Sequence, residues 1–235
     1  MEATIRFGNT RPAISFAINV PSFSERSAKA SKGKLKQTGD FILYRLLATP
    51  SAWVYLKAKY DHKIVNAELL ARYRNTGYFL YGNRTGTSFD AMVPSMISFP
   101  KKSYVVVEPK QISGAIFEKV APSLGALPLP ESNKAAGAFL KAVETRLNEK
   151  NAMVIYPETT AGIGSLSDFA CGAFRYPIKS GAPSFCFTNV LCEKRLVTYL
   201  DGPFYPDRKL SAAAQSADLQ KRIRETMERR MKENN

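Results

Sequence analysis

Residues 78–90 read YFLYGNRTGTSFD, and residues 152–162 read AMVIYPETTAG. Each stretch is a short apolar run that ends in polar, glycine or proline residues, which is typical of a buried strand followed by a loop. Between them lie a β-branched run at 103–107 and an apolar stripe at helical spacing over 134–148. Strands that alternate with helices predict an α/β fold, with a mostly parallel sheet flanked by helices.

The same alternation extends outward from these two stretches. We expect strands at 78–81, 103–107, 126–129, 152–156, 184–189 and 195–200, and helices at 90–97, 114–124, 134–148 and 212–232. The spacing of the apolar residues decides between the two kinds of element. It predicts an α/β domain over residues 77–210, followed by a charged C-terminal helix over residues 211–235.

The part before residue 77 has a different composition. Residues 1–40 lack a sustained apolar pattern and are rich in Ser and Lys, which predicts a basic, mobile N-terminal segment. This segment is either a solvated tail or a segment attracted to an anionic membrane. Residues 41–76 are expected to be helical.

Within it, residues 41–56 read FILYRLLATPSAWVYL. This run is too short and too interrupted to span a bilayer, which takes about 20 apolar residues. It is either a buried helical hairpin bent near Pro50, or an interfacial segment with Trp53 and Tyr55 at the level of the lipid headgroups.

Composition narrows the function classes. The chain has 235 residues, 45% of them apolar, and a formal net charge of +14. Such a charge favours an anionic partner, namely a membrane surface, a phosphorylated substrate or nucleic acid. No nucleic-acid-binding motif is present, which argues against that third partner.

The cysteines and the N-terminus bear on metals and location. Three cysteines without a CxxC pair, together with one histidine, argue against a zinc site, and we expect no metal. The sparse cysteines and the lack of a signal-peptide pattern predict a cytoplasmic protein, peripherally associated with a membrane.

Polar residues follow both of the strands quoted above. Active sites of α/β folds collect where strands end, so these residues form the candidate site. They are Asn83, Arg84, Thr85 and Asp90 after the first strand, and Glu158, Thr159 and Thr160 after the second. Each could be ordinary turn chemistry; Asp90, for example, could cap the helix that follows it.

Together the two stretches resemble the PlsC-type glycerolipid acyltransferases of the lysophosphatidate acyltransferase kind. That family carries an Asn-His-x4-Asp motif after one strand and a Phe-Pro-Glu-Gly-Thr-Arg motif after a later one. Asn83 and Asp90 match the first motif, and Tyr156-Pro157-Glu158 matches the second. The resemblance covers about residues 78–205, roughly half of the chain, and includes further landmarks at residues 125–129 (GALPL), Phe169, Gly172-Ala173 and Ala182-Pro183.

The resemblance implies a fold and a reaction. In the family, the histidine takes a proton from a glycerol hydroxyl, the aspartate orients that histidine, and the hydroxyl attacks an acyl thioester. The implied donor is acyl-CoA or acyl carrier protein, the implied acceptor is a lysophosphatidate-like lipid, and no cofactor is needed. By the same resemblance, Asp90 and Glu158 would be catalytic. Substrate would be bound by Asn83, Arg84, Thr85, Thr159 and Thr160.

The sequence departs from the family at the base. Arg84 follows Asn83, and a guanidinium is protonated at neutral pH and has no lone pair to accept a proton. Five residues separate Arg84 from Asp90, so an alignment on the aspartate places Thr85 at the base position. The second motif lacks the family's glycine and arginine. The sole histidine, His62, lies outside both motifs, and we expect it to be a surface or packing residue.

Two hypotheses follow for the activity and two for Arg84. The chain is either an active acyltransferase that uses an altered base or a substrate-assisted route, or a silent relative that binds lipid or acyl carrier. Asp90 or Glu158 could be the altered base if burial raised its pKa. Arg84 either binds the acceptor's phosphate or forms an ion pair with Asp90 that closes a dead site.

Overall fold

A computed structural model describes residues 49–108, 123–130, 133–162, 165–170 and 172–233. Its strands form one sheet in the order β1-β7-β6-β2-β5-β3-β4. All neighbouring strands in it are parallel except β6 and β7, which confirms the predicted mostly parallel sheet. The strands are β1 (Lys63–Val65), β2 (Tyr78–Gly82), β3 (Ser103–Val107), β4 (Ala126–Pro128), β5 (Ala152–Ile155), β6 (Ser184–Cys192) and β7 (Arg195–Phe204).

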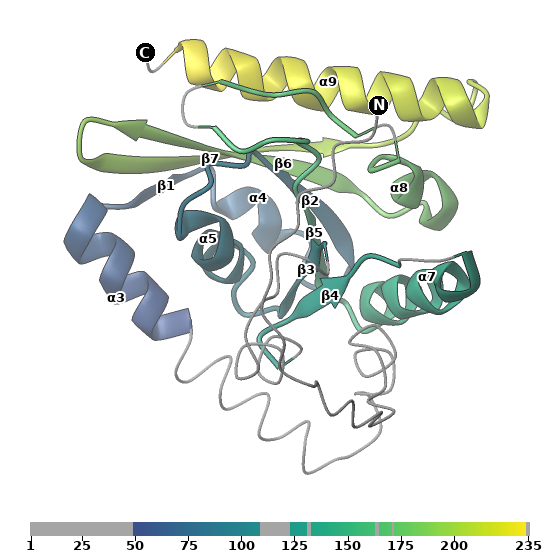
Figure 1. Cartoon of the computed structure of the whole chain (residues 1–235), viewed down its shortest axis with the longest axis horizontal. Coiled ribbons are helices and arrows are strands. Elements are labelled where there is room, and N and C mark those ends of the chain that lie inside the picture. The colour runs from purple at the N-terminus through teal and green to yellow at the C-terminus, as the bar shows by residue number, and fades with distance from the viewer. Residues whose placement is uncertain (1–48, 109–122, 131–132, 163–164, 171, 234–235) are drawn as a thin grey trace, which may run out of the picture.

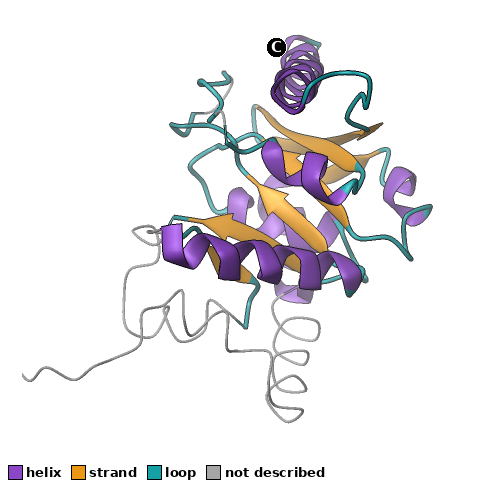
Figure 2. Ribbon diagram, turned by 90° about the vertical axis from the view of Figure 1, so that its right-hand side faces the viewer, coloured by secondary structure: helices purple, strands orange, loops and turns teal. Residues whose placement is uncertain are grey.

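Helices cover both faces of this sheet (Figures 1 and 2). They are α3 (Thr49–Tyr60), α4 (Glu68–Ala71), α5 (Phe89–Ile97), α7 (Asn133–Asn148), α8 (Arg175–Ser180) and α9 (Ala212–Lys232). One apolar cluster packs α7 and α9 against one face, and a second packs α3, α4 and α5 against the other.

Strand β2 shows why the centre of the sheet reads as a continuous apolar run. Phe79 and Tyr81 belong to the cluster under α7 and α9, whereas Tyr78 and Leu80 belong to the cluster under α5. All four side chains are buried, because successive residues of a strand point to opposite faces and both faces are covered here. Each such side chain contributes about 2 kcal/mol of hydrophobic free energy.

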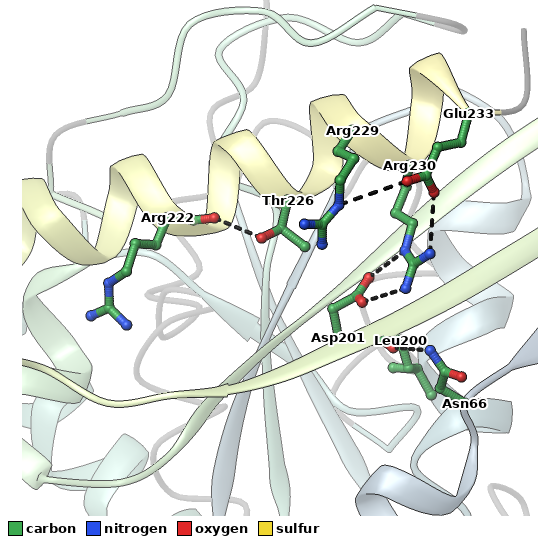
Figure 3. Close-up of polar contacts among 8 residues, drawn as sticks. All are labelled: Asn66, Leu200, Asp201, Arg222, Thr226, Arg229, Arg230 and Glu233. Atoms are coloured by element: carbon green, nitrogen blue, oxygen red, sulfur yellow. Dashed lines mark hydrogen bonds and ion pairs between the residues drawn. The ribbon is translucent and has the colours of Figure 1, made fainter.

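Helix α9 is held to the sheet by an ion pair as well as by its apolar face. The Arg230 guanidinium donates to both oxygens of Asp201 on β7, at 3.0 and 2.7 Å, and lies over the ring of Tyr199. Figure 3 shows this contact together with the ion pairs of Glu233 with Arg229 and Arg230. The two-pronged geometry fixes the end of α9 over β7.

The elements agree with the sequence-based expectations where the apolar runs are long. The helix expected at 114–124 and the segment at 1–40 lie outside the described residues. Strands β6 and β7 run past their expected ends because they pair as a hairpin. Two short elements, β1 and α8, were missed, and α4 is a short helix within the stretch expected to be helical.

The described part of residues 41–76 is not purely helical. Strand β1 lies at the edge of the sheet, parallel to β7, which corrects the expectation of helix alone. Helix α3 begins at Thr49 and runs through Pro50 to Tyr60, and the first arm of the helical hairpin that the sequence left open, residues 41–48, lies outside the described residues. Proline is tolerated there because the first turn of a helix has no hydrogen bond to lose.

The surface of α3 is unusual. Ala52 and Leu56 are buried, but Trp53, Val54 and Tyr55 are exposed by 56%, 59% and 37%. Among the residues that the structure describes, none of the helices combines the length and the apolar character that crossing a bilayer requires.

Candidate functional site

The two motif loops meet at one edge of the sheet. Strands β2 and β5 are parallel neighbours, with Tyr81 opposite Ile155, so both loops leave the sheet at its carboxyl edge. A groove of about 700 Å³ opens there and brings together Arg84, Asp90 and Glu158. Glu158 is far from Arg84 and Asp90 in the sequence, and the parallel pairing of β2 with β5 brings it to them.

The groove is mostly apolar beyond these three residues. Its walls come from β3, β4, β5, the residue after β4 and the start of α8. They include Val105, Val106, Ala126, Leu129, Ile155 and Tyr176. An apolar cleft with a few convergent polar groups is the usual form of a small-molecule site.

Asp90 binds the loop that precedes it. Its Oδ1 accepts hydrogen bonds from the Thr85 N–H at 3.2 Å and the Thr85 hydroxyl at 2.8 Å, and its Oδ2 accepts one from the Gly86 N–H at 2.9 Å. It is therefore not a simple cap of α5, as the sequence left open. Burial raises the pKa of the Asp90 carboxyl, and the hydrogen bonds from Thr85 and Gly86 oppose that rise.

Glu158 joins the two loops to each other. Its Oε1 accepts the Arg84 N–H at 2.5 Å and its Oε2 accepts the Ser167 N–H at 2.9 Å. The Gly162 N–H donates to the Arg84 carbonyl at 2.8 Å on the same seam. Glu158 is 3% exposed, and burial raises the pKa of its carboxyl. Both motif carboxylates thus direct their oxygens at backbone N–H groups.

Thr85 occupies the place beside Asp90 that a base would need. Its hydroxyl donates to Asp90, so it accepts from the Thr87 hydroxyl at 2.6 Å. The Thr85 side chain is buried and does not line the groove. A threonine hydroxyl in this position is a proton donor to Asp90 and no substitute for an imidazole.

Arg84 lies at the groove, and its guanidinium is close enough for its charge to act on Asp90. Its side chain is half-buried, and within the described part of the chain it makes no hydrogen bond or ion pair. The ion pair with Asp90, which the sequence left open, is therefore not formed. Asp90 instead accepts three hydrogen bonds from its own loop.

Asn83 begins a buried polar chain that leads away from the groove. Its side-chain amide exchanges two hydrogen bonds with the backbone of Asn189 on β6, at 2.9 and 2.7 Å. The Thr198 hydroxyl donates to the Asn189 side chain at 2.7 Å, and His62 Nε2 lies 2.8 Å from that hydroxyl. Because the hydroxyl already donates to Asn189, it accepts from the His62 Nε2–H.

His62 is thus a packing residue, as expected. It is 7% exposed, and burial, with a smaller effect of Lys57, lowers its pKa to about 4. Sequence reasoning missed Asn189 and Thr198, although both are polar residues within apolar strands, which is the signal that could have found them.

The remaining candidates lie at the rim. Thr159 lines the groove and is exposed, whereas Thr160 is exposed and lies outside it. Tyr156, which matches the second motif but was not among the predicted site residues, lines the groove and donates its hydroxyl to the Asp90 carbonyl at 2.6 Å. No group of three or more His, Cys, Asp or Glu side chains arranged to hold a metal occurs among the described residues.

Comparisons with known proteins give a likeness of fold. No family model matches the chain, and no curated protein matches it. Among solved structures, the chain is similar to the 1-acyl-sn-glycerophosphate (LPA) acyltransferase PlsC from Thermotoga maritima, with a TM-score of 0.59 and 12% identity. The match covers 88% of this chain and 86% of that one. At such low identity it supports the fold that the motifs implied.

Proposed function

We propose that the groove binds the acyl chain of a lipid or of an acyl thioester, in a catalytically silent relative of the acyltransferases. The observation that carries this proposal is the pairing of a largely apolar groove with a motif in which Thr85, not a histidine, donates to Asp90. The groove volume of about 700 Å³ falls in the range of small-molecule sites.

Acyl transfer needs a group that accepts the proton of the attacking hydroxyl. Glu158 has both oxygens on backbone N–H groups, and Asp90 takes three donors from its loop. Arg84 cannot accept a proton at neutral pH. The residues at the groove therefore favour binding over turnover.

One observation favours acyl transfer as a second candidate. Asp90 lines the groove, and burial raises the pKa of its carboxyl, which makes it a better proton acceptor. In this case the acceptor hydroxyl passes its proton to Asp90 while its oxygen forms an ester bond to the thioester carbonyl carbon. The carbon–sulfur bond breaks, and the leaving thiolate of CoA or acyl carrier protein takes the proton.

An anionic membrane surface is the proposed source of the lipid. The exposed Trp53, Val54 and Tyr55 of α3 are followed by Lys57 and Lys59, a mixture of aromatic and basic residues that suits the interface of an anionic bilayer. Sedimentation with anionic vesicles would recover the wild type, and Trp53→Glu would weaken that recovery. Equal recovery of both would contradict this part of the proposal.

The function is tested by measuring binding and thiol release together. The full chain is titrated with a fluorescent acyl probe and incubated with acyl-CoA and lysophosphatidate on anionic vesicles. We expect saturable probe binding without thiol release, and loss of binding in Val106→Trp, which fills the groove. Thiol release that Asp90→Asn abolishes would establish the second candidate. Absence of probe binding would overturn both.

Two further variants test whether the missing base alone explains the silence. Arg84→His restores the residue that follows the asparagine in the family's motif, and Thr85→His places an imidazole at the position that contacts Asp90. Thiol release gained by either variant would show that the groove is otherwise complete. No gain in either would place the defect elsewhere, the altered second motif being the first place to look.

A further inference from the structure

Arg84 is a cation placed at the end of an apolar groove. It follows β2 and lines the groove beside Asp90 and Glu158. Its side chain is half-buried and has no hydrogen bond or ion pair within the described residues. A guanidinium carries five N–H donors, so it has donors to spare for an acceptor that enters the groove.

The neighbouring carboxylates accept no hydrogen bond from the Arg84 guanidinium. Asp90 binds Thr85 and Gly86, and Glu158 binds the N–H groups of Arg84 and Ser167. These hydrogen bonds direct the negative charges into the loops. They also hold the backbone of Arg84 in place, so the guanidinium extends from a fixed point of the loop.

We propose that Arg84 anchors the oxyanion at the end of a single-chain lipid, a carboxylate or a phosphate monoester, whose acyl chain lies along the apolar walls. This inference rests on the proposed function, because it takes for granted that the groove holds an acyl chain. A planar guanidinium matches the two oxygens of either group. The residue that removes the base thus supplies the selectivity of the site for charged lipids.

Asp90, Glu158 and Glu108 also line the groove and repel a bound anion. Glu108 is exposed, which leaves its charge to solvent. The repulsion by Asp90 gives the inference a second handle, because Asp90→Asn removes a charge and keeps an oxygen acceptor for the loop. That change strengthens anion binding if Arg84 holds the anion.

The test compares ligands with one chain length and different ends. A fatty acid, a lysophosphatidate and a neutral monoacylglycerol each displace the fluorescent acyl probe from the wild type, Arg84→Gln and Arg74→Gln. Arg74 is an exposed arginine before β2, at the opposite end of that strand from Arg84, and serves as the matched control.

We expect Arg84→Gln to weaken the two anionic ligands by about tenfold or more and the neutral one by less than about twofold. Arg74→Gln should change none of them, and Asp90→Asn should tighten the anionic ligands. Which anion loses more identifies the carboxylate or the phosphate as the preferred end. Inorganic phosphate alone, added as a competitor, shows whether the anion site works without the chain.

Two outcomes separate the failure of this inference from that of the proposed function. If all three ligands bind Arg84→Gln as tightly as the wild type, Arg84 does not anchor the anion. The proposal that the groove holds an acyl chain would still stand. Binding of none of them to the wild type overturns both. A thermal melt of Arg84→Gln that matches the wild type excludes unfolding as the reason for weaker binding.

Discussion

Two networks of polar side chains meet at Asn83-Arg84, and they differ in charge. On the groove side, Asp90 and Glu158 are carboxylates whose oxygens face backbone N–H groups of the loops. On the sheet side, the chain through Asn189 and Thr198 to His62 consists of neutral side chains. We call these the loop clamp and the neutral chain.

The difference does not follow from burial, since Glu158 is 3% exposed and His62 is 7% exposed. It follows from the donors near each group, because Asp90 and Glu158 face backbone N–H groups and lie close to Arg84, which together reduce the cost of a charge. Thr198 is fully buried and His62 nearly so, and there neutral groups cost less to bury than a charge would, although the Asn189 side-chain nitrogen has no hydrogen-bond partner among the described residues. The loops after β2 and β5 are thus held by charged side chains, whereas the end of β2 is held to β6 by neutral ones.

The largest effect is expected in the neutral chain. Thr198→Val removes a hydroxyl that serves both His62 and Asn189, and leaves two buried groups without a partner. Each such group costs about 1–3 kcal/mol, so we expect a loss of about 3 kcal/mol in the free energy of unfolding. Urea denaturation measures it, with Thr198→Ser as the control that keeps the hydroxyl. Equal stability of both variants would show that the chain adds nothing.

The loop clamp should lose less, because water can enter the groove. Glu158→Ala removes the acceptor of the Arg84 and Ser167 N–H groups, and we expect a loss of about 2 kcal/mol. Glu158→Gln keeps one acceptor oxygen and should lose about 1 kcal/mol. Glu144→Ala, at an exposed position of α7, is the control. A loss as large as that of Thr198→Val would contradict the assigned difference between the two groups.

The pH dependence sharpens the comparison. The folded pKa of His62 is about 4 against an ordinary 6.5, so between these values the unfolded chain binds more protons. Stability is therefore lost as pH falls from 6.5 toward 4, by about 1–2 kcal/mol once partial solvent screening of the ring is allowed for.

The raised pKa values of Asp90 and Glu158 act in the opposite direction, because the folded chain holds those protons more tightly. His62→Gln keeps a donor for Thr198 and removes the ring. Melting temperatures of the variant and the wild type, measured from pH 7 to pH 4, should diverge below pH 6.5. Parallel curves would refute a neutral buried ring.

The smallest effect on stability is expected at Arg84. Its side chain has no hydrogen bond or ion pair within the described residues, so Arg84→Gln should change the free energy of unfolding by less than about 0.5 kcal/mol. Urea denaturation against the wild type tests this. A loss above about 1 kcal/mol would mean that the side chain belongs to the loop clamp after all.

The sequence predicts the sheet better than its connections. Apolar runs such as 78–81 and 152–156 place the central strands, because burial on both faces demands them. Strand β1 is too short and too exposed to leave a pattern, and the antiparallel pairing of β7 with β6 depends on contacts across the chain.

The sequence likewise predicts the residues of the site better than their hydrogen-bond partners. Positions after the strands predict which residues reach the groove, as Arg84, Asp90 and Glu158 do. Their partners could not be predicted, because a backbone N–H leaves no mark in the sequence. Thr198 and Asn189 lie far from the motif along the chain, and only the strand order β7-β6-β2 brings them to Asn83.

The exposed helix α3 carries the chain's single tryptophan, Trp53. Its fluorescence emission therefore reports the solvent exposure of one helix surface and responds little to unfolding of the sheet. A blue shift on adding vesicles would come from α3 alone, free of any signal from the core. Tyrosine emission or circular dichroism is the signal that follows the fold itself.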